Sequence, residues 1–190
     1  MEKPLAGKTV AILVANGFEE TEMTEPQRAL LAAGATVKVI SPEQGLVNGW
    51  HSRSWGHYFP VDVAISEALA ADFDALIVPG GERSIEKLAG NAHAKRLTKG
   101  FADGGKPMIM VNHAPALLAA AERAAGKTIV ADPEIAEQLA TAGATVVTED
   151  TMKTDGRLMT AAGEYEVNAL KAALVDHIAE TEGNPAAAAA

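Results

Sequence analysis

The chain has 190 residues, 48% of them hydrophobic, with 25 acidic residues against 16 lysines and arginines and no cysteine. The formal net charge of −9 argues against nucleic acid or an anionic membrane surface as a partner, because phosphate groups are bound by basic faces. Without cysteine, disulfides, thiolate metal ligands and thiol nucleophiles are excluded, and no apolar run approaches the roughly 20 residues that cross a bilayer.

The length suits one well-buried domain, which we expect over residues 1–182. Residues 183–190, Gly-Asn-Pro followed by five alanines, carry no capping or packing signal and are expected to form a disordered tail. With no apolar stretch long enough for a signal peptide, the sequence predicts a cytoplasmic protein.

The first forty residues predict a strand, a helix and a second strand. Residues 8–15 form an apolar run that Asn16-Gly17 ends with turn chemistry. The helix that follows begins with several glutamates and ends at Gly34, and residues 36–40 are again apolar and β-forming. Such a βαβ unit implies a parallel sheet with a right-handed crossover.

Residues 45–60 interrupt this alternation and predict a hairpin or an excursion from the fold. They contain four of the eight aromatic residues, among them both tryptophans, Trp50 and Trp55. An exposed aromatic cluster of this size usually marks a contact surface. We therefore expect a homo-oligomer that uses this segment.

The second half of the chain continues the α/β alternation. A strand over residues 74–78 ends at Gly80-Gly81, and the short apolar run 108–111 predicts a strand buried on both faces. The remaining elements expected are helices over 92–102, 116–121, 134–142 and 167–178, strands over 127–130 and 144–147, and a hairpin over 151–160 that turns at Asp155-Gly156.

The segment from Pro107 to Pro115 is the main functional signal in the sequence. Asn112 and His113 lie between a buried strand and a helix-forming run, where a tight turn lifts one side chain above the carboxyl edge of a parallel sheet. Hydrolases place a nucleophile at such an elbow. The residue here is Asn112, whose carboxamide is a poor nucleophile, and we expect it to adopt a strained, positive-φ backbone conformation.

Glu19 follows the first strand and is therefore expected at the same edge of the sheet as Asn112. We predict that the Asn112 amide donates a hydrogen bond to the Glu19 carboxylate. Glu20 and Glu22 need no such role, because acids in the first turn of a helix interact favourably with its dipole.

The backbone N–H groups of Gly80, Gly81 and His113 are candidates for an oxyanion hole, since paired glycines allow close approach of a ligand oxygen. A plain tight turn explains the glycines equally well. The His113 side chain is a general base, a ligand or a half-buried histidine with satisfied hydrogen bonds.

No cofactor or metal is expected. The first strand-to-helix turn has one glycine and two acids where a dinucleotide would place its phosphate, so repulsion disfavours a nucleotide or flavin. His51 and His57 are six residues apart in a segment without helical period, which fits no standard zinc site.

Four stretches together resemble the DJ/ThiJ/PfpI superfamily, most closely its PfpI-like intracellular protease and amidase branch. They are Phe18-Glu-Glu-Thr-Glu-Met-Thr-Glu-Pro, Asp74-Ala-Leu-Ile-Val-Pro-Gly-Gly, Gly105-Lys-Pro and Val111-Asn-His-Ala-Pro. The resemblance covers residues 8–180. It implies a flavodoxin-like three-layer α/β sandwich with a central, mostly parallel sheet, related to class I glutamine amidotransferases, and assembly into dimers or hexamers.

The resemblance also implies roles for individual residues. In that family the elbow carries Cys-His-Gly-Pro with the cysteine as nucleophile, so Asn112 takes the place of the cysteine and His113 that of its histidine partner. Glu19 takes the place of the carboxylate that hydrogen-bonds the thiol. Glu86 matches a glutamate that some members supply near a subunit interface, but only with a one-residue gap.

Three functions follow as alternatives. The first is a pseudoenzyme, a small-molecule-binding or stress-related homologue that lacks covalent catalysis. The second is an enzyme, a hydrolase, hydratase or glyoxalase-like lyase, that uses Glu19 and His113 as an acid/base pair. The third is a scaffold in which the aromatic 50–60 segment builds an oligomer and the pocket is vestigial.

Overall fold

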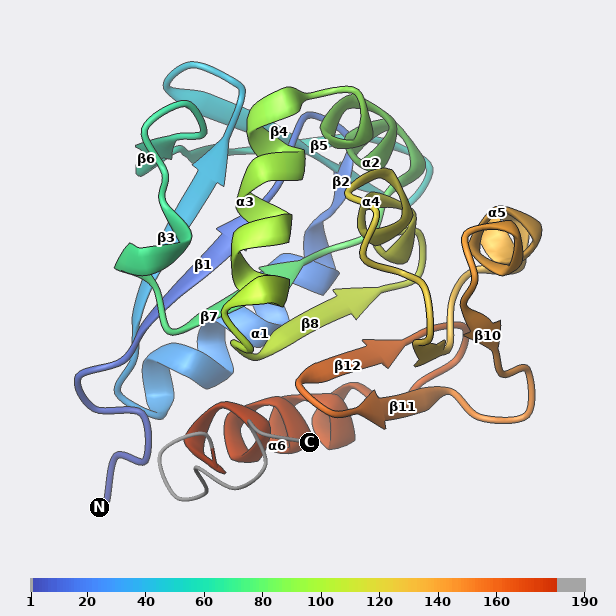
Figure 1. Cartoon of the computed structure of the whole chain (residues 1–190). Helices are drawn as coiled ribbons and strands as arrows, with labels where there is room; N and C mark the ends of the chain where they lie inside the picture. Colours follow the sequence, from blue (N-terminus) through green and yellow to red (C-terminus); the bar gives the residue numbers. More distant parts are fainter. Residues whose placement is uncertain (1, 181–190) are drawn as a thin grey trace.

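The computed structural model describes residues 2–180, which fold around a seven-stranded sheet of order β11-β12-β8-β7-β1-β3-β6 (Figure 1). All neighbouring strands pair in parallel except the edge hairpin of β11 and β12. The disordered tail predicted for 183–190 lies outside the described residues. The strands of this sheet are β1 (Thr9–Leu13), β3 (Thr36–Ser41), β6 (Val63–Ala64), β7 (Ala75–Val78), β8 (Met108–Val111), β11 (Met152–Asp155) and β12 (Leu158–Ala161).

Helices cover both faces of the sheet (Figure 1). Helices α1 (Glu20–Ala32) and α6 (Val167–Ala179) lie on one face. The opposite face is covered by α2 (Glu82–Ala89), α3 (Ala92–Asp103) and α4 (Pro115–Ala120). The rest are α5 (Ala136–Thr141), the 3-10 turns η1 (Ala70–Asp72) and η2 (Pro133–Ile135), and the two-stranded sheet of β9 (Thr128–Ile129) and β10 (Thr145–Val146).

The central strands separate two hydrophobic cores because successive side chains point to opposite faces. In β1, Ala11 and Leu13 belong to the core under α2, α3 and α4, whereas Val10 and Ile12 belong to the core under α1 and α6. All four side chains are fully buried. This is why the first strand is a continuous apolar run, and the α/β sandwich with a mostly parallel central sheet is confirmed.

The aromatic 45–60 segment forms the predicted hairpin. Its strands β4 (Leu46–His51) and β5 (Ser54–Pro60) pair antiparallel, and the short strand β2 (Phe18–Glu19) pairs in parallel with β4. The resulting three-stranded sheet lies beside the carboxyl ends of the central strands, near α2 (Figure 1).

Helix α2 is the one substantial element that the sequence did not predict. Its eight residues directly follow the Gly80-Gly81 turn, and only Ser84, Ile85 and Leu88 are buried. Two apolar positions give too short a pattern to recognise beside a glycine turn. The consequence is a helix whose first turn opens directly at the edge of the sheet where a ligand would bind.

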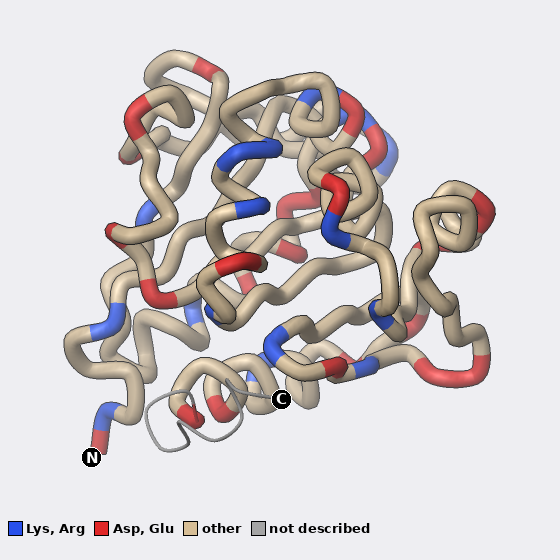
Figure 2. Tube along the Cα trace, viewed as in Figure 1, with Lys and Arg blue, Asp and Glu red and all other residues tan. Residues whose placement is uncertain are grey.

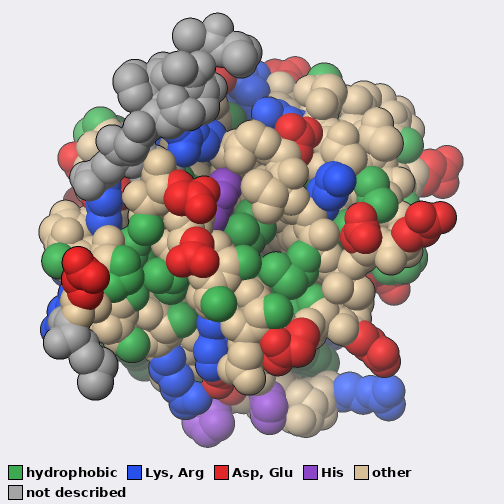
Figure 3. Space-filling model, turned by 90° about the horizontal axis from the view of Figure 1, so that it is seen from below, with side chains coloured by type: hydrophobic (Ala, Val, Ile, Leu, Met, Phe, Trp, Pro, Cys, Tyr) green, Lys and Arg blue, Asp and Glu red, His purple; other side chains and the backbone are tan. Residues whose placement is uncertain are grey.

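Surface charge and apolar character are distributed unevenly. Basic residues lie along α3 (Figure 2) although the chain is acidic overall. On the side of α6, hydrophobic side chains gather near the middle of the face with charged ones around them (Figure 3). Within residues 2–180, none of the helices combines the length and the apolar character needed to cross a membrane.

Candidate functional site

Asn112 occupies the turn between β8 and α4 with φ of 52°, so the strained elbow predicted from the sequence is confirmed. Non-glycine residues rarely adopt this left-handed conformation, and asparagine tolerates it better than most. The backbone N–H of Asn112 donates to the carbonyl of Ala161 on the neighbouring strand at 2.8 Å. The sheet therefore holds the residue at its carboxyl edge.

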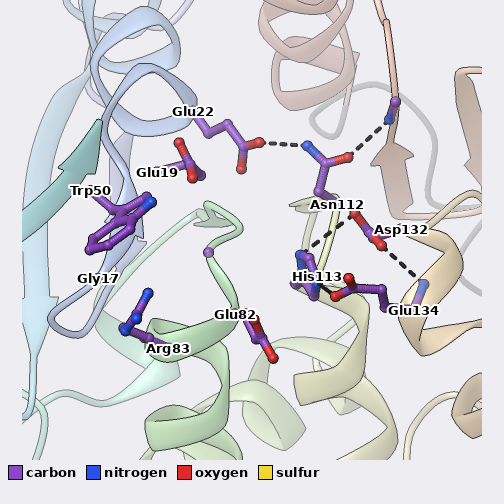
Figure 4. Close-up of a pocket in the computed structure, with 12 residues that line it drawn as sticks. Gly17, Glu19, Glu22, Trp50, Glu82, Arg83, Asn112, His113, Asp132 and Glu134 are labelled. Carbon is purple, nitrogen blue, oxygen red and sulfur yellow. Dashed lines mark hydrogen bonds and ion pairs between the residues drawn. The ribbon is translucent and has the colours of Figure 1, made fainter. Parts of the chain in front are cut away.

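The Asn112 side chain is held at both ends. Its Nδ2 donates to Glu22 Oε1 at 2.5 Å, and its Oδ1 accepts from the backbone N–H of Gly163 at 2.9 Å (Figure 4). Donor and acceptor are therefore distinguished by their partners. The two hydrogen bonds therefore fix the Asn112 amide in one orientation.

Glu22 is the buried carboxyl group of the site, with 7% of the residue exposed. Its second oxygen, Oε2, accepts from the backbone N–H of Gly80 at 2.6 Å. Burial raises the pKa of Glu22 to about 7, although the hydrogen bonds from Asn112 and Gly80 favour the ionised form. At neutral pH both the acid and the carboxylate form of this group are therefore populated.

The predicted pairing of Asn112 with Glu19 is wrong, because the partner is Glu22. Glu19 is the N-cap residue of α1, whereas Glu22 lies three residues further along and points from the helix toward the elbow. Glu19 still lines the cavity that opens beside the elbow, and partial burial raises its pKa. The spacing Glu-x-x-Glu is the signal that could have identified Glu22, since residues i and i+3 share one helix face.

Glu20 also departs from the expectation of a surface acid that interacts with the helix dipole. It is buried, and it accepts from the backbone N–H of His57, with His57 Nδ1 at 3.1 Å from Oε2. Gly49 and Gly56 make room for it, because a Cβ at either position would collide with the Glu20 side chain. Glu20 thus fastens the aromatic hairpin to α1.

The expected oxyanion hole is only partly available. The N–H of Gly80 is used by Glu22. Those of Gly81 and His113 make no hydrogen bond within residues 2–180, and both residues line the cavity described below. Gly81 has φ of 106°, and a Cβ there would lie 2.4 Å from the carbonyl oxygen of Gly17, so only glycine fits.

A second group of polar side chains surrounds the His113 ring. Nε2 of His113 lies 2.9 Å from Glu134 Oε2, and Nδ1 lies 3.8 Å from Asp132 Oδ2 (Figure 4). The N–H of Asp132 donates to the Asn112 carbonyl at 3.0 Å, which ties the two loops together. Asp132 and Glu134 were not singled out in the sequence, because they lie some twenty residues beyond the elbow and only the fold brings them to it.

These residues line one cavity of about 470 Å³ at the carboxyl edge of the sheet. Trp50 and Arg83 form its far side, with the Arg83 guanidinium 4.3 Å from the centre of the Trp50 ring (Figure 4). Five of its twelve lining residues are acids, against one arginine and one histidine. The cavity is therefore polar and predominantly negative. The complete lining is Gly17, Glu19, Glu22, Trp50, Gly81, Glu82, Arg83, Asn112, His113, Asp132, Glu134 and Gly163.

The remaining predicted residues lie outside this cavity. Glu86 is exposed on α2 and lines a separate hollow, to which His113 also contributes. Trp55 is 53% exposed and packs edge-on against Trp50, with ring centres 5.4 Å apart. A role of these residues in a subunit interface stays a prediction.

Comparisons with known proteins agree on one family. The profile of the DJ-1/PfpI family matches residues 8–177. General stress protein 18 of Bacillus subtilis is 32% identical over 155 residues, which cover 81% of this chain and 88% of the relative. YraA of the same organism, named as a candidate cysteine protease, is 36% identical over 138 residues, which cover 72% of this chain and 79% of the relative.

Solved structures agree as well. A two-domain protein from Anabaena variabilis with DJ-1/ThiJ/PfpI-like and ferritin-like domains superposes with a TM-score of 0.83 at 26% identity. The match covers 90% of this chain and 48% of that protein, so this chain corresponds to about half of it.

Proposed function

Because this chain belongs to the DJ-1/PfpI family and contains no cysteine, we propose that it binds a small polar molecule non-covalently in the cavity at Asn112. The observation that carries this proposal is the Asn112 side chain itself. It stands at a strained elbow where relatives are expected to hold a nucleophile, and it is fixed there by Glu22 and Gly163. The elbow is intact and its residue is a hydrogen-bonding amide.

The cavity supplies donors and acceptors for such a ligand. The free N–H groups of Gly81 and His113 suit a carbonyl or carboxylate oxygen, and Glu19 and Glu22 suit a donor. Thiolate chemistry of the kind that the name of YraA implies is not available to an asparagine. A stress-related role, which the name of General stress protein 18 suggests, belongs to the same proposal, as does a cytoplasmic location.

A second candidate function is proton transfer on a bound molecule, and one observation favours it. The pKa of Glu22 is raised to about 7 by burial, which is where a general acid/base works best at neutral pH. Glu22 thus replaces Glu19 in the acid/base pair with His113. A pH–rate profile governed by a group with pKa near 7, lost in Glu22→Gln, would favour this enzyme over the binding protein.

The experiment that tests the loss of the nucleophile is Asn112→Cys, compared with Asn168→Cys. Asn168 is exposed on α6, so both variants carry a single thiol in a chain without others. If the cavity retains a thiol-activating geometry, the thiol at position 112 should react with iodoacetamide at least about tenfold faster at pH 7 than the exposed control. Equal rates would mean that the cavity has lost that geometry.

Turnover separates the two candidate functions. Wild type should not consume methylglyoxal, whereas the Asn112→Cys variant should gain measurable activity. Robust consumption by wild type would contradict the non-covalent proposal, because a route without cysteine would then exist. Titration calorimetry of wild type with small amides and aldehydes would measure binding directly.

We also expect association of two or more copies through the hairpin of β4 and β5. Trp55 and Tyr58 are 53% and 67% exposed on its outer strand, and β5 is an edge strand with unpaired backbone groups. Analytical ultracentrifugation should find a dimer or hexamer at micromolar concentration that Trp55→Ser with Tyr58→Ser weakens. A wild-type monomer would contradict this.

A further inference from the structure

Three potential metal ligands meet beside the elbow, namely His113, Asp132 and Glu134. Each offers one ligand atom, and these atoms lie within 4.8 Å of one another. No other such group of at least three histidine, aspartate or glutamate side chains occurs within residues 2–180. The earlier expectation that the chain has no metal site was based on the spacing of His51 and His57 alone and did not consider this set.

We propose that His113, Asp132 and Glu134 bind a divalent transition-metal ion such as Zn²⁺. One imidazole nitrogen and two carboxylate oxygens are borderline to hard donors, which suit Zn²⁺, Co²⁺ and Mn²⁺ and exclude the thiolate-dependent sites of Cu⁺. Three protein ligands leave at least one coordination position for water or a small molecule. That position would face the same cavity as Asn112.

Two of the three ligands, His113 and Glu134, are already close to the spacing that a metal requires. With metal–ligand distances of about 2.0–2.2 Å, two neighbouring ligands lie roughly 3.3 Å apart in a tetrahedral site. His113 Nε2 and Glu134 Oε2 are 2.9 Å apart, and the His113 side chain is only 17% exposed. Glu134 is 70% exposed, so its carboxylate can adjust without disturbing the core.

Backbone hydrogen bonds hold the ligand-bearing segments together. The Asp132 N–H donates to the Asn112 carbonyl at 3.0 Å, so the loop that carries both acids is fixed to the residue before His113. Asp132 Oδ1 accepts from the Glu134 N–H at 3.0 Å, which leaves Oδ2 toward the His113 ring. The backbone that carries the three ligands and the Asp132 side chain are thus held in place before any ion binds, and the Glu134 carboxylate is the part that adjusts.

The charge of the cavity supports a cation rather than an anion. Glu19, Glu22 and Glu82 line it together with the two proposed acidic ligands, whereas Arg83 is its only lysine or arginine. A divalent ion would offset the repulsion among these carboxylates. This observation is independent of the distances among the three ligands, and both lead to the same class of ligand.

The metal site does not depend on the proposed role of Asn112. His113 and Glu134 pair with each other, whereas Glu22 is hydrogen-bonded to Asn112 and Gly80, so we expect the Glu22–Asn112 hydrogen bond to be retained when either metal ligand is replaced. A protein that binds the small molecule but no metal would contradict only the metal proposal, and a protein that binds metal but no small molecule would contradict only the proposed function.

The test is titration calorimetry of tag-free, chelator-treated full-length protein with ZnCl₂, together with visible spectroscopy of the Co²⁺ form. We expect one ion per chain with a dissociation constant in the micromolar range or below, and Co²⁺ absorption bands typical of four or five ligands. His113→Ala, Asp132→Asn and Glu134→Gln should each weaken Zn²⁺ binding at least about tenfold. Controls are His93→Ala and Glu137→Gln, which remove an exposed histidine and an exposed acid elsewhere.

Two results would overturn the proposal. One is Zn²⁺ affinity that falls no further in the three ligand variants than in the two controls. The other is a Co²⁺ spectrum that stays that of the hydrated ion at millimolar concentration. If His113→Ala does not fold, as judged by circular dichroism, the near-isosteric Asp132→Asn and Glu134→Gln variants still decide the question.

Discussion

The two sides of the cavity differ in how firmly the protein holds its polar groups. On the first side, which we call the deep wall, Glu22, Asn112, Gly80 and Gly163 are joined by hydrogen bonds of 2.5 to 2.9 Å around a buried carboxyl group. On the second, the open wall of His113, Asp132 and Glu134, carboxylates face solvent around one ring.

This difference separates two sources of chemistry. The deep wall has its hydrogen-bonding capacity largely used within the protein, so burial sets its protonation and its geometry. The open wall keeps lone pairs accessible, so it can bind a cation that is present in solution. Substitutions on the deep wall should therefore change stability more than substitutions on the open wall do, and substitutions on the open wall should change metal binding.

The largest effect on stability is expected at Gly81, which follows Gly80 of the deep wall and packs against Gly17 and Phe18. A Cβ at Gly81 would lie 2.4 Å from the Gly17 carbonyl oxygen and 2.9 Å from Phe18 Cα, at a φ of 106°. We expect Gly81→Ala to lower the free energy of unfolding by roughly 4 kcal/mol, from backbone strain and overpacking together. Urea denaturation measures this.

The matched control for Gly81→Ala is Gly126→Ala. Gly126 also has positive φ, 78°, but nothing lies within 4 Å of a Cβ there. Gly126→Ala should lower the free energy of unfolding by only about 1 kcal/mol, because it adds backbone strain without a steric collision. Equal losses in the two variants would mean that the backbone around Gly81 gives way easily and that the deep wall is not rigid.

The next effect is a dependence of stability on pH through Glu22. Its pKa is 4.5 in the unfolded chain and about 7 when folded. Below pH 4.5 both states are protonated and burial has no ionisation cost. Between 4.5 and 7 the unfolded state releases its proton first, so stability falls as pH rises, by about 3 kcal/mol in total above pH 7.

The variant that isolates this contribution is Glu22→Gln, which cannot ionise. The difference in unfolding free energy between wild type and Glu22→Gln, measured from pH 4 to pH 8, should move against wild type by about 3 kcal/mol. A difference that stays constant with pH would mean that Glu22 keeps an ordinary pKa and that the hydrogen bonds from Asn112 and Gly80 offset its burial.

The two walls also differ in how much of their structure could be predicted from the sequence. The elbow was predictable because a buried strand, a turn residue that tolerates positive φ and Pro115 at the start of a helix all point to one local structure. The strand pairing was predictable in part, since the first strand, helix and second strand were expected to form a parallel unit and β1 and β3 do pair in parallel. Local signals of this kind need no knowledge of the fold.

The residues that complete the site were less accessible to sequence reasoning. Choosing Glu22 over Glu19 as the partner of Asn112 requires the rotation of α1 about its axis. That rotation depends on where the helix begins, and helix boundaries are poorly determined by local sequence. Asp132 and Glu134 reach the elbow only because strand β9 and the loop that follows it bring them there. Tertiary packing, not local pattern, determines both.

A third prediction concerns the hydrogen bond that closes the deep wall. Asn112→Asp would replace the amide donor by a carboxylate facing Glu22, whose oxygen lies 2.5 Å from the present nitrogen. At pH 8 two adjacent carboxylates should cost about 2 kcal/mol of stability, whereas near pH 5 they can share a proton and the cost should largely vanish. The control is Asn168→Asp on the exposed start of α6, expected to stay within about 0.5 kcal/mol of wild type at both pH values. A loss independent of pH would point to strain at the elbow rather than to charge.

The smallest change in stability is expected on the open wall, and it decides whether the two walls really differ. Glu134→Ala removes the partner of His113, but Glu134 is 70% exposed, so its contact with the His113 ring is screened by water. We expect the free energy of unfolding in chelator-treated protein to fall by less than about 0.5 kcal/mol at pH 7. With saturating Zn²⁺ the gap between wild type and Glu134→Ala should widen, because only wild type would bind the ion tightly in its folded state. Urea denaturation with and without Zn²⁺ measures both quantities on one pair of proteins. A loss above about 1 kcal/mol without metal would show that the open wall also carries the fold, since exposed ion pairs do not contribute that much.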